Sequence, residues 1–303
     1  MTLPPLRQAL AFAVLALTLG ACSPLTAFAT LTPTDRAQQA GQGLAYGSEP
    51  RQRLDLYAPP QGAQDAPVAV FFYGGTWENG RRQDYGWVGR ALAAEGFLTL
   101  APDYRLYPEV TYPTFLEDGA AAIAWAVENA AQHGGDPSQI VLIGHSAGAY
   151  NAVMLGLDRR YLEAAGVDPS RIRAVAGLAG PYDFLPLKGE TVRGVFGGAP
   201  DLAATQPINQ ADDQAPPAFL ATGGDDSVVL PRNSEALAAA LQARGVVVET
   251  RIYPDLGHAG VLLALSKPLR GRAPVLEDMT AFLRRHTEVG TETANEVAAR
   301  QTR

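Results

Sequence analysis

The chain alternates mostly apolar short runs with stretches whose apolar residues have helical spacing. Such runs predict strands that are buried on both faces. Buried strands separated by crossover helices are typical of a mainly parallel sheet with helices on both sides, so the pattern predicts an α/β fold. The predicted strands are Arg53–Ala58, Val68–Tyr73, Phe97–Ala101, Gln139–Gly144, Ile172–Leu178, Ala218–Thr222 and Val246–Tyr253.

Three segments stand apart from this alternation. A helix predicted over Phe115–Gln132 ends at the sequence GGDP (Gly134–Pro137), which is a strong helix stop. The insertion Leu185–Pro217 is rich in Gly, Pro and Asp, lies between two predicted strands and is expected to form a short lid over the functional site. The polar sequence from Thr287 predicts a tail, residues 287–303.

The first residues of the chain resemble an export signal. Ala9–Cys22 is almost wholly apolar and follows one positive charge at Arg7, but it is shorter than the ~20 residues that span a bilayer. The sequence LGAC at Leu19–Cys22 resembles the bacterial lipobox, in which the cysteine is acylated and becomes the first residue of the mature protein. The alternative is an ordinary secretory signal that is cut elsewhere, for example after Ala27 or Ala29. Both interpretations export the protein.

These signals set the expected domain boundaries. Residues 1–21 form the predicted signal peptide, and Cys22 carries the predicted lipid anchor. Residues 22–45 contain Pro, Thr, Gln and Gly without periodicity, which predicts a flexible tether, and residues 46–286 form one folded domain. We therefore expect an exported bacterial lipoprotein, anchored to a membrane in the periplasm or at the cell surface. Without the lipid it would be secreted or periplasmic.

Composition excludes several classes of function. Of 303 residues, 47% are hydrophobic, which is enough to fill a sizeable core. The net charge of -7 lacks the positive field that nucleic acid selects, so no nucleic-acid partner is expected. One cysteine and four scattered histidines offer neither an internal disulfide nor a tetrahedral metal site. None of these features determines the oligomeric state.

The strongest chemical signal is a G-x-S-x-G motif that follows a predicted strand. Ser146 lies between Gly144 and Gly148, directly after the apolar run Ile140–Ile143. A sharp strand-to-helix turn at this point projects the hydroxyl toward a base, and the small glycines leave room for the turn. The N–H of Ala147 then faces a developing oxyanion. The alternative is a glycine-rich strand end, but the flanking strand and helix favour Ser146 as the nucleophile.

Of the four histidines, His258 has the position expected of the base. It follows the last predicted strand, in a loop at the carboxyl end, where open α/β sheets build their sites. His133 at a helix end and His286 in a basic segment have structural explanations. His145 fills the variable position of the serine motif and is expected to be a neighbour of the site. We therefore predict that His258 is the base.

The orienting acid is expected between the serine and the histidine in chain order, after a strand. Asp225 and Asp226 follow Ala218–Thr222, and only one of them can face the imidazole. Asp226 is favoured because it stands three residues before Val229 and five before Pro231, as in the pattern D-x-x-V-x-P.

Two glycines predict the part of the oxyanion hole that faces Ser146 from another loop. Gly74 and Gly75 follow the strand Val68–Tyr73 and let the backbone approach a substrate carbonyl closely, with their N–H groups as the second half of an oxyanion hole. In isolation, this Gly-Gly pair could also be a simple turn.

In this order, the motifs resemble those of esterases of the α/β-hydrolase fold, particularly the bacterial carboxylesterase and feruloyl-esterase-like branch related to hormone-sensitive lipase. That branch carries H-G-G-x-W-x-x-G, D-Y-R-L-x-P, G-G-D-P and G-x-S-A-G, and the resemblance covers about residues 45–286. It implies oxyanion donors at Gly75 or Thr76 together with Ala147. The matching residues are Gly74-Gly75-Thr76-Trp77 with Gly80, Asp103-Tyr104-Arg105-Leu106 with Pro108, Gly134-Gly135-Asp136-Pro137, and Gly144–Gly148.

One position departs from the branch. Tyr73 stands where a histidine usually precedes Gly-Gly. That histidine is not the base, and a phenol can also hydrogen-bond to the loop, so catalysis is expected to survive. Asp103 and Arg105 are expected to form a structural network beneath the site.

The predicted reaction is hydrolysis of a small-molecule carboxylic ester through an acyl-enzyme, without a cofactor. Ser146 attacks the carbonyl, His258 takes its proton and Asp226 holds the histidine tautomer. The alternative on the same fold is an aryl formamidase or a peptidase, and the alternative of another class is a catalytically silent surface-binding lipoprotein. The small lid predicts short acyl groups, and the acidic net charge favours a neutral ester.

Overall fold

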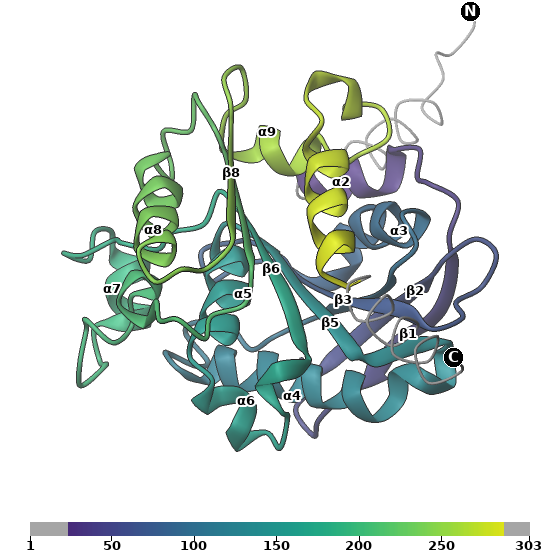
Figure 1. Cartoon of the computed structure of the whole chain (residues 1–303), viewed down its shortest axis with the longest axis horizontal. Helices are drawn as coiled ribbons and strands as arrows, with labels where there is room; N and C mark the ends of the chain where they lie inside the picture. Colours follow the sequence, from purple (N-terminus) through teal and green to yellow (C-terminus); the bar gives the residue numbers. More distant parts are fainter. Residues whose placement is uncertain (1–23, 288–303) are drawn as a thin grey trace, which may run out of the picture.

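The computed structural model describes residues 24–287 and shows one eight-stranded sheet (Figure 1). The strands are β1 Gln38–Ala45, β2 Arg53–Ala58, β3 Ala66–Phe72, β4 Leu98–Pro102, β5 Gly135–His145, β6 Ile172–Leu178, β7 Ala218–Gly223 and β8 Val248–Tyr253. Their order is β1-β2-β4-β3-β5-β6-β7-β8. β2 pairs antiparallel with β1 and β4, and the other pairs are parallel.

The predicted α/β fold is confirmed, because each of the seven predicted strands is present. β2 and β6 have the predicted bounds, and the others differ by a few residues at their ends. β5 begins earlier than predicted, at Gly135, because it also pairs with the start of β3. The mostly buried central strands explain why their sequences are apolar runs and not alternating patterns.

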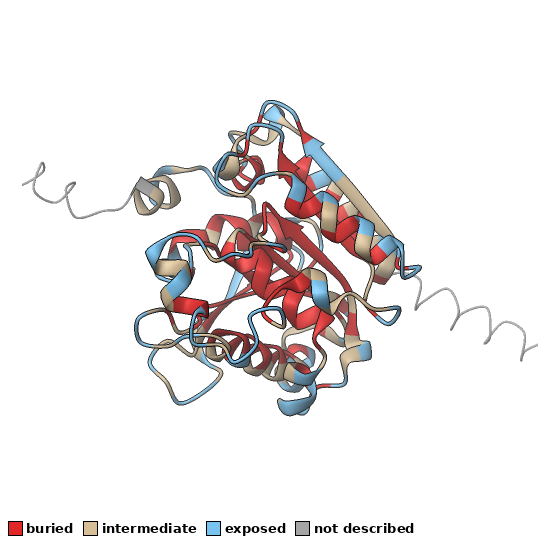
Figure 2. Cartoon of the chain, turned by 90° about the vertical axis from the view of Figure 1, so that its left-hand side faces the viewer, coloured by how far each residue is buried: buried red, intermediate tan, exposed pale blue. Residues whose placement is uncertain are grey.

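Helices cover both sides of the sheet, and Figure 2 shows the buried strands between them. Every residue of the helix that follows β5 is buried, which agrees with its small and apolar sequence. The helix predicted over 115–132 consists of an α-helix and a 3₁₀ turn, and it ends at Gly134, whose φ of 80° is left-handed. The helices are α2 Pro24–Leu31, α3 Gly86–Ala94, α4 Thr114–Asn129, α5 Ala147–Leu157, α6 Arg160–Ala164, α7 Glu190–Phe196, α8 Arg232–Gln242, α9 His258–Leu263 and a last helix over 275–287, with 3₁₀ turns η1 Arg82–Tyr85, η2 Ala130–His133, η3 Pro169–Arg171, η4 Pro207–Gln210 and η5 Arg270–Arg272.

The prediction of a flexible tether is wrong for residues 24–45, which form α2 and β1. Phe28 of α2 makes an edge-to-face contact with Trp87, with ring centroids 5.4 Å apart. Asp35 forms an ion pair with Arg270 at 2.8 Å. β1 is an edge strand whose side chains are largely exposed, so backbone pairing with β2 stabilises it and no apolar alternation marks it in the sequence.

Two predicted segments lie outside the described residues. The signal peptide and Cys22 fall within residues 1–23, and the predicted tail falls within residues 288–303, apart from Thr287, which lies in the last helix. Export, lipidation and the tail therefore stay predictions. Within residues 24–287, no helix is long and apolar enough to cross a membrane.

Candidate active site

Ser146 occupies the tight turn between β5 and α5. Its φ of 56° and ψ of −123° are strained for a residue with a side chain, and the turn is held by a 2.9 Å hydrogen bond from the Ser146 N–H to the Leu178 carbonyl. The flanking glycines are required by close packing. A Cβ at Gly148 would lie 2.1 Å from the Phe72 carbonyl oxygen, and one at Gly144 would lie 2.1 Å from the Gly148 carbonyl oxygen.

Ser146, His258 and Asp226 form one hydrogen-bonded chain. His258 Nε2 lies 2.9 Å from Ser146 Oγ, and His258 Nδ1 lies 2.8 Å from Asp226 Oδ2. The three residues follow β5, β8 and β7 respectively, and the carboxyl ends of parallel strands meet at one edge of the sheet. The chain order Ser, Asp, His therefore becomes a single spatial cluster.

Local hydrogen bonds decide which of the adjacent aspartates faces His258. Asp226 Oδ1 accepts the N–H groups of Val228 and Val229 at 2.9 and 2.8 Å, which leaves Oδ2 for the imidazole. The Asp226 side chain is fully buried, whereas Asp225 is exposed. The structure therefore places Asp226, and not Asp225, against the imidazole, and the bond to Val229 gives the D-x-x-V spacing a physical reason.

The glycine loop after β3 approaches the serine closely. A Cβ at Gly74 would lie 2.9 Å from the Ser146 Cβ, so only glycine fits there. Gly75, Thr76 and Trp77 have φ of 131°, 55° and 57°, and the Gly75 carbonyl accepts two N–H groups that close the turn. Thr76 and Ala147 line the same cavity as Ser146, while Gly75 does not line it.

Tyr73, which stands at the position of the usual histidine, holds this loop through hydrogen bonds of its buried side chain. Its hydroxyl donates to Asp103 Oδ1 at 2.8 Å and accepts from Arg51 Nη2 at 2.8 Å, and Arg51 also donates to the Gly80 carbonyl. The ring stacks on Tyr85 and Tyr104, with centroids 5.1 and 4.8 Å away. Burial raises the pKa of Tyr73 well above its ordinary value, so the phenol stays neutral.

The network expected from Asp103 and Arg105 consists of two separate clusters. Asp103 pairs with Arg82, which also bonds Asp55 at 2.9 Å. Arg105 instead pairs with the buried Asp118 at 2.7 Å. Both clusters fix the loops that follow β3 and β4.

The other histidines lie as the sequence predicts. His133 ends η2 with its ring stacked near Trp125, and His286 in the last helix packs on Phe282. His145 is buried beside the site, with Nε2 3.0 Å from the His258 carbonyl oxygen and ring centroids 4.9 Å apart. Because a carbonyl only accepts, the His145 Nε2 carries the proton. Burial, reinforced by the charge of His258, lowers the pKa of His145 to about 3.

This buried imidazole predicts an acid-dependent loss of stability. In the unfolded chain His145 binds a proton near its ordinary pKa of 6.5, but the folded protein does not bind one until about pH 3. Its contribution is therefore complete above pH 6.5 and is lost as the pH falls toward 3. Between pH 7 and pH 5 the wild type should lose about 2 kcal/mol more stability than His145→Gln. Urea unfolding at both pH values measures this; equal losses in the two proteins would show that His145 titrates normally.

Ser146 opens onto a cavity of about 360 Å³. Leu185, Lys188 and Val192, from the insertion 185–217, form part of its wall. Asn233 at the start of α8 is a lining residue that sequence reasoning missed. The remaining lining residues are Thr76, Trp77, Ala147, Pro181, Asp183, Phe184, Pro186, Ser227, Val228, Val229, Leu230 and Arg232.

Asn233 ties two walls of this cavity together. Its Oδ1 accepts the N–H groups of Tyr182 and Asp183, both at 3.0 Å, and its Nδ2 donates to the Leu230 carbonyl. No local motif marks this role, because the bonded partners lie about fifty residues earlier in the chain.

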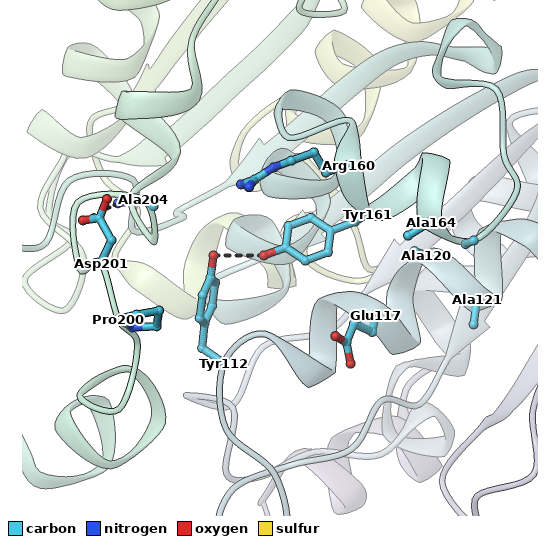
Figure 3. Close-up of a pocket in the computed structure, with 11 residues that line it drawn as sticks. Tyr112, Glu117, Ala120, Ala121, Arg160, Tyr161, Ala164, Pro200, Asp201 and Ala204 are labelled. Carbon is cyan, nitrogen blue, oxygen red and sulfur yellow. Dashed lines mark hydrogen bonds between the residues drawn. The ribbon is translucent and has the colours of Figure 1, made fainter.

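A larger hollow of about 790 Å³ lies elsewhere, between α4, α6 and the 185–217 insertion (Figure 3). The hydroxyls of Tyr112 and Tyr161 meet there at 2.9 Å, but none of the predicted site residues lines it. In the described part of the chain, no group of three or more His, Cys, Asp or Glu side chains could hold a metal ion. The cavity beside Ser146 is therefore the candidate active site.

The chain is similar in sequence to proteins that are described as esterases. A rice protein (Oryza sativa subsp. japonica) described as a probable isoprenylcysteine alpha-carbonyl methylesterase, ICMEL1, is 33% identical over 273 residues, which cover 82% of this chain but 63% of the rice protein. Carboxylesterase NlhH of Mycobacterium tuberculosis is 33% identical over 247 residues, covering 72% of this chain and 74% of that protein.

The fold has solved counterparts, and a family model covers most of the domain. The structure of esterase B from Lactobacillus rhamnosis superposes with a TM-score of 0.78 at 20% identity, over 95% of this chain and 99% of that chain. The family model described as BD-FAE matches residues 54–241, which is more than half of the sequence. The chain therefore belongs to the BD-FAE family, among the carboxylesterase-like α/β-hydrolases related to hormone-sensitive lipase.

Proposed function

We propose that this protein hydrolyses carboxylic esters through an acyl-enzyme on Ser146. The observation that carries the proposal is the hydrogen-bonded chain from Ser146 through His258 to Asp226, in which Ser146 lines a cavity together with Thr76 and Ala147. The relatives with esterase names support the same reaction class.

In the first half of the reaction, Ser146 Oγ attacks the ester carbonyl carbon while His258 Nε2 takes the hydroxyl proton. The carbonyl oxygen becomes an oxyanion, for which the backbone N–H groups of Gly75, Thr76 and Ala147 are the proposed donors. The intermediate then collapses, the bond to the alcohol oxygen breaks, and His258 returns the proton to the leaving alcohol.

In the second half, water attacks the acyl-enzyme with His258 again as the base, which releases the acid and restores Ser146. Asp226 keeps the proton of the neutral imidazole on Nδ1, so that Nε2 is free to accept, and stabilises the imidazolium that forms. The bonds from Val228 and Val229 to Asp226 Oδ1 hold the carboxylate for this role.

The proposal predicts esters of short acyl groups as the preferred substrates. The cavity of about 360 Å³ lies at the lower end of the roughly 300–1,000 Å³ typical of small-molecule sites. We expect kcat/KM for nitrophenyl esters to peak at two to six acyl carbons and to fall by about tenfold or more at twelve. The same assays are run on a feruloyl ester, an aryl formamide and an anilide with a matched acyl group. The amides are included because the alternative functions on this fold, an aryl formamidase or a peptidase, cleave amides. Faster hydrolysis of the anilide, or of long-chain triglycerides, would contradict the proposal.

A further inference from the structure

Two cations line the cavity beside Ser146. Lys188 comes from the insertion, just before α7, and Arg232 is the first residue of α8. In Figure 1, α7 and α8 lie on the same side of the molecule. Asp183 is the one carboxylate among the residues that line the cavity, so the formal charge of the lining is positive.

This local charge is opposite to that of the chain, whose net charge is -7. Many arginines of the domain are neutralised by carboxylates, such as Arg82 by Asp103 and Arg159 by Asp212. Among the ion pairs in residues 24–287, none includes Lys188 or Arg232. The two cations beside the candidate nucleophile are therefore available to an external anion.

The position of Arg232 is electrostatically unfavourable for the fold. A helix N-terminus carries partial positive charge, which repels a cation in the first turn. Glu235 in that turn is exposed, and no ion pair joins it to Arg232. Local stability thus gives no reason for an arginine at this position, whereas a bound anion would.

The backbone positions of Asp183 and Arg232 are tied to each other. Asn233, the neighbour of Arg232, accepts the N–H groups of Tyr182 and Asp183 and so joins the start of α8 to the segment that leads into the insertion. Asp183 and Arg232 are therefore held on connected walls of one cavity. A rigid scaffold of this kind lets flexible charged side chains act on one bound molecule.

The same cavity also presents exposed apolar side chains. Val228 is 71% exposed, Leu230 46% and Leu185 38%, and all three line the cavity. They are three of the seven large hydrophobic side chains that are exposed in the described residues. Apolar contacts and cations at one site suit a molecule that has an apolar part and an anionic end.

We propose that the preferred substrates are small esters whose acyl or alcohol part ends in a carboxylate or a similar anion, which Lys188 and Arg232 attract. The inference rests on the proposed ester hydrolysis and adds the charge of the substrate. It differs from the neutral ester that the net charge of the chain favours, because field strength at the site depends on nearby charges. Each exposed cation of this kind is expected to change kcat/KM for an anionic ester by about two- to fivefold.

The test compares kcat/KM for matched anionic and neutral esters. The acyl-side pair is the 4-nitrophenyl monoester of adipic acid against 4-nitrophenyl hexanoate, and the alcohol-side pair is 4-acetoxybenzoate against phenyl acetate. The readout is the anionic-to-neutral ratio, and comparison between variants cancels the intrinsic reactivity of each ester. The pair whose ratio responds identifies which side of the ester faces the cations.

Lys188→Gln and Arg232→Gln should each lower the ratio by about two- to fivefold, and the double variant by about the product. Asp183→Asn should raise it. The chain has two lysines, so Lys267→Gln outside the cavity is the matched control, and its ratio should equal that of the wild type. In the wild type, added salt should lower the ratio, a readout that needs no variant.

The inference is overturned if the double variant and added salt leave both ratios unchanged while the wild type still hydrolyses the neutral esters. Failure of the wild type to hydrolyse any of the four esters would instead overturn the proposed function, and the substrate charge with it.

Discussion

Replacing Ser146 by alanine is expected to lower kcat for a short nitrophenyl ester by about four to six orders of magnitude. The acyl-enzyme needs an oxygen nucleophile 2.9 Å from His258 Nε2, and alanine has none. Because the three residues of such a hydrogen-bonded chain act as a unit, losing the serine leaves only the rate enhancement that comes from substrate binding and from the proposed oxyanion donors. Stopped or continuous assays at saturating substrate measure the change.

The matched control is Ser170→Ala, which removes a hydroxyl from an exposed serine outside the cavity. Its kcat should stay within about twofold of the wild type, as for surface substitutions generally. Circular dichroism of both variants checks that the fold is kept. A Ser146→Ala protein with more than a tenth of the wild-type kcat would mean that another group attacks the ester.

Asp226→Asn is expected to lower kcat by about four orders of magnitude, while Asp225→Asn changes it by less than about twofold. The N–H groups of Val228 and Val229 select an acceptor, so they orient the new amide with its oxygen toward the backbone. The amide nitrogen then faces His258 Nδ1 and donates to it. This forces the proton onto Nε2, which can no longer accept the proton of Ser146.

Asp225 provides the control because it is adjacent, equally charged and exposed, with its backbone N–H bonded to the Leu256 carbonyl. Steady-state kinetics of the two variants at one pH compare them directly. Equal and mild losses in both would show that the orienting acid lies outside this loop.

The sequence was sufficient to predict the central strands of the sheet but not its edge strand β1. The central strands β3, β4, β6 and β7 are marked by apolar runs, because burial on both faces leaves no polar alternation, whereas the edge strand β8 is only partly buried. β1 is marked by nothing comparable, since its backbone pairs with β2 while its side chains remain largely exposed. α2 depends on a contact between Phe28 and Trp87, which are 59 positions apart and share no local pattern.

The cluster around Ser146 was predictable because topology converts chain order into proximity. Residues after β5, β7 and β8 meet at one edge of a parallel sheet, so a serine, an aspartate and a histidine in these loops must approach one another. Local spacing was also informative, since the hydrogen bond from the Val229 N–H to the Asp226 carboxylate joins residues that are three positions apart.

The walls of the cavity were not predictable in the same way. Lys188 and Arg232 lie on separate elements, and their meeting at one cavity depends on the path of the insertion. Asn233 acts through hydrogen bonds to residues about fifty positions away. The replacement of histidine by Tyr73 was visible in the sequence, but its partners Arg51 and Asp103 depend on the packing of three loops.

The central claim is that Ser146 is an activated nucleophile, and covalent labelling tests it most directly. A fluorophosphonate reacts with a serine only where a base activates the hydroxyl, so one equivalent should bind the wild type, and mass spectrometry of the digest should place it on the peptide containing Ser146. The Ser146→Ala protein should remain unlabelled. A folded wild type that takes up no label, or a label on any other residue, would contradict the account.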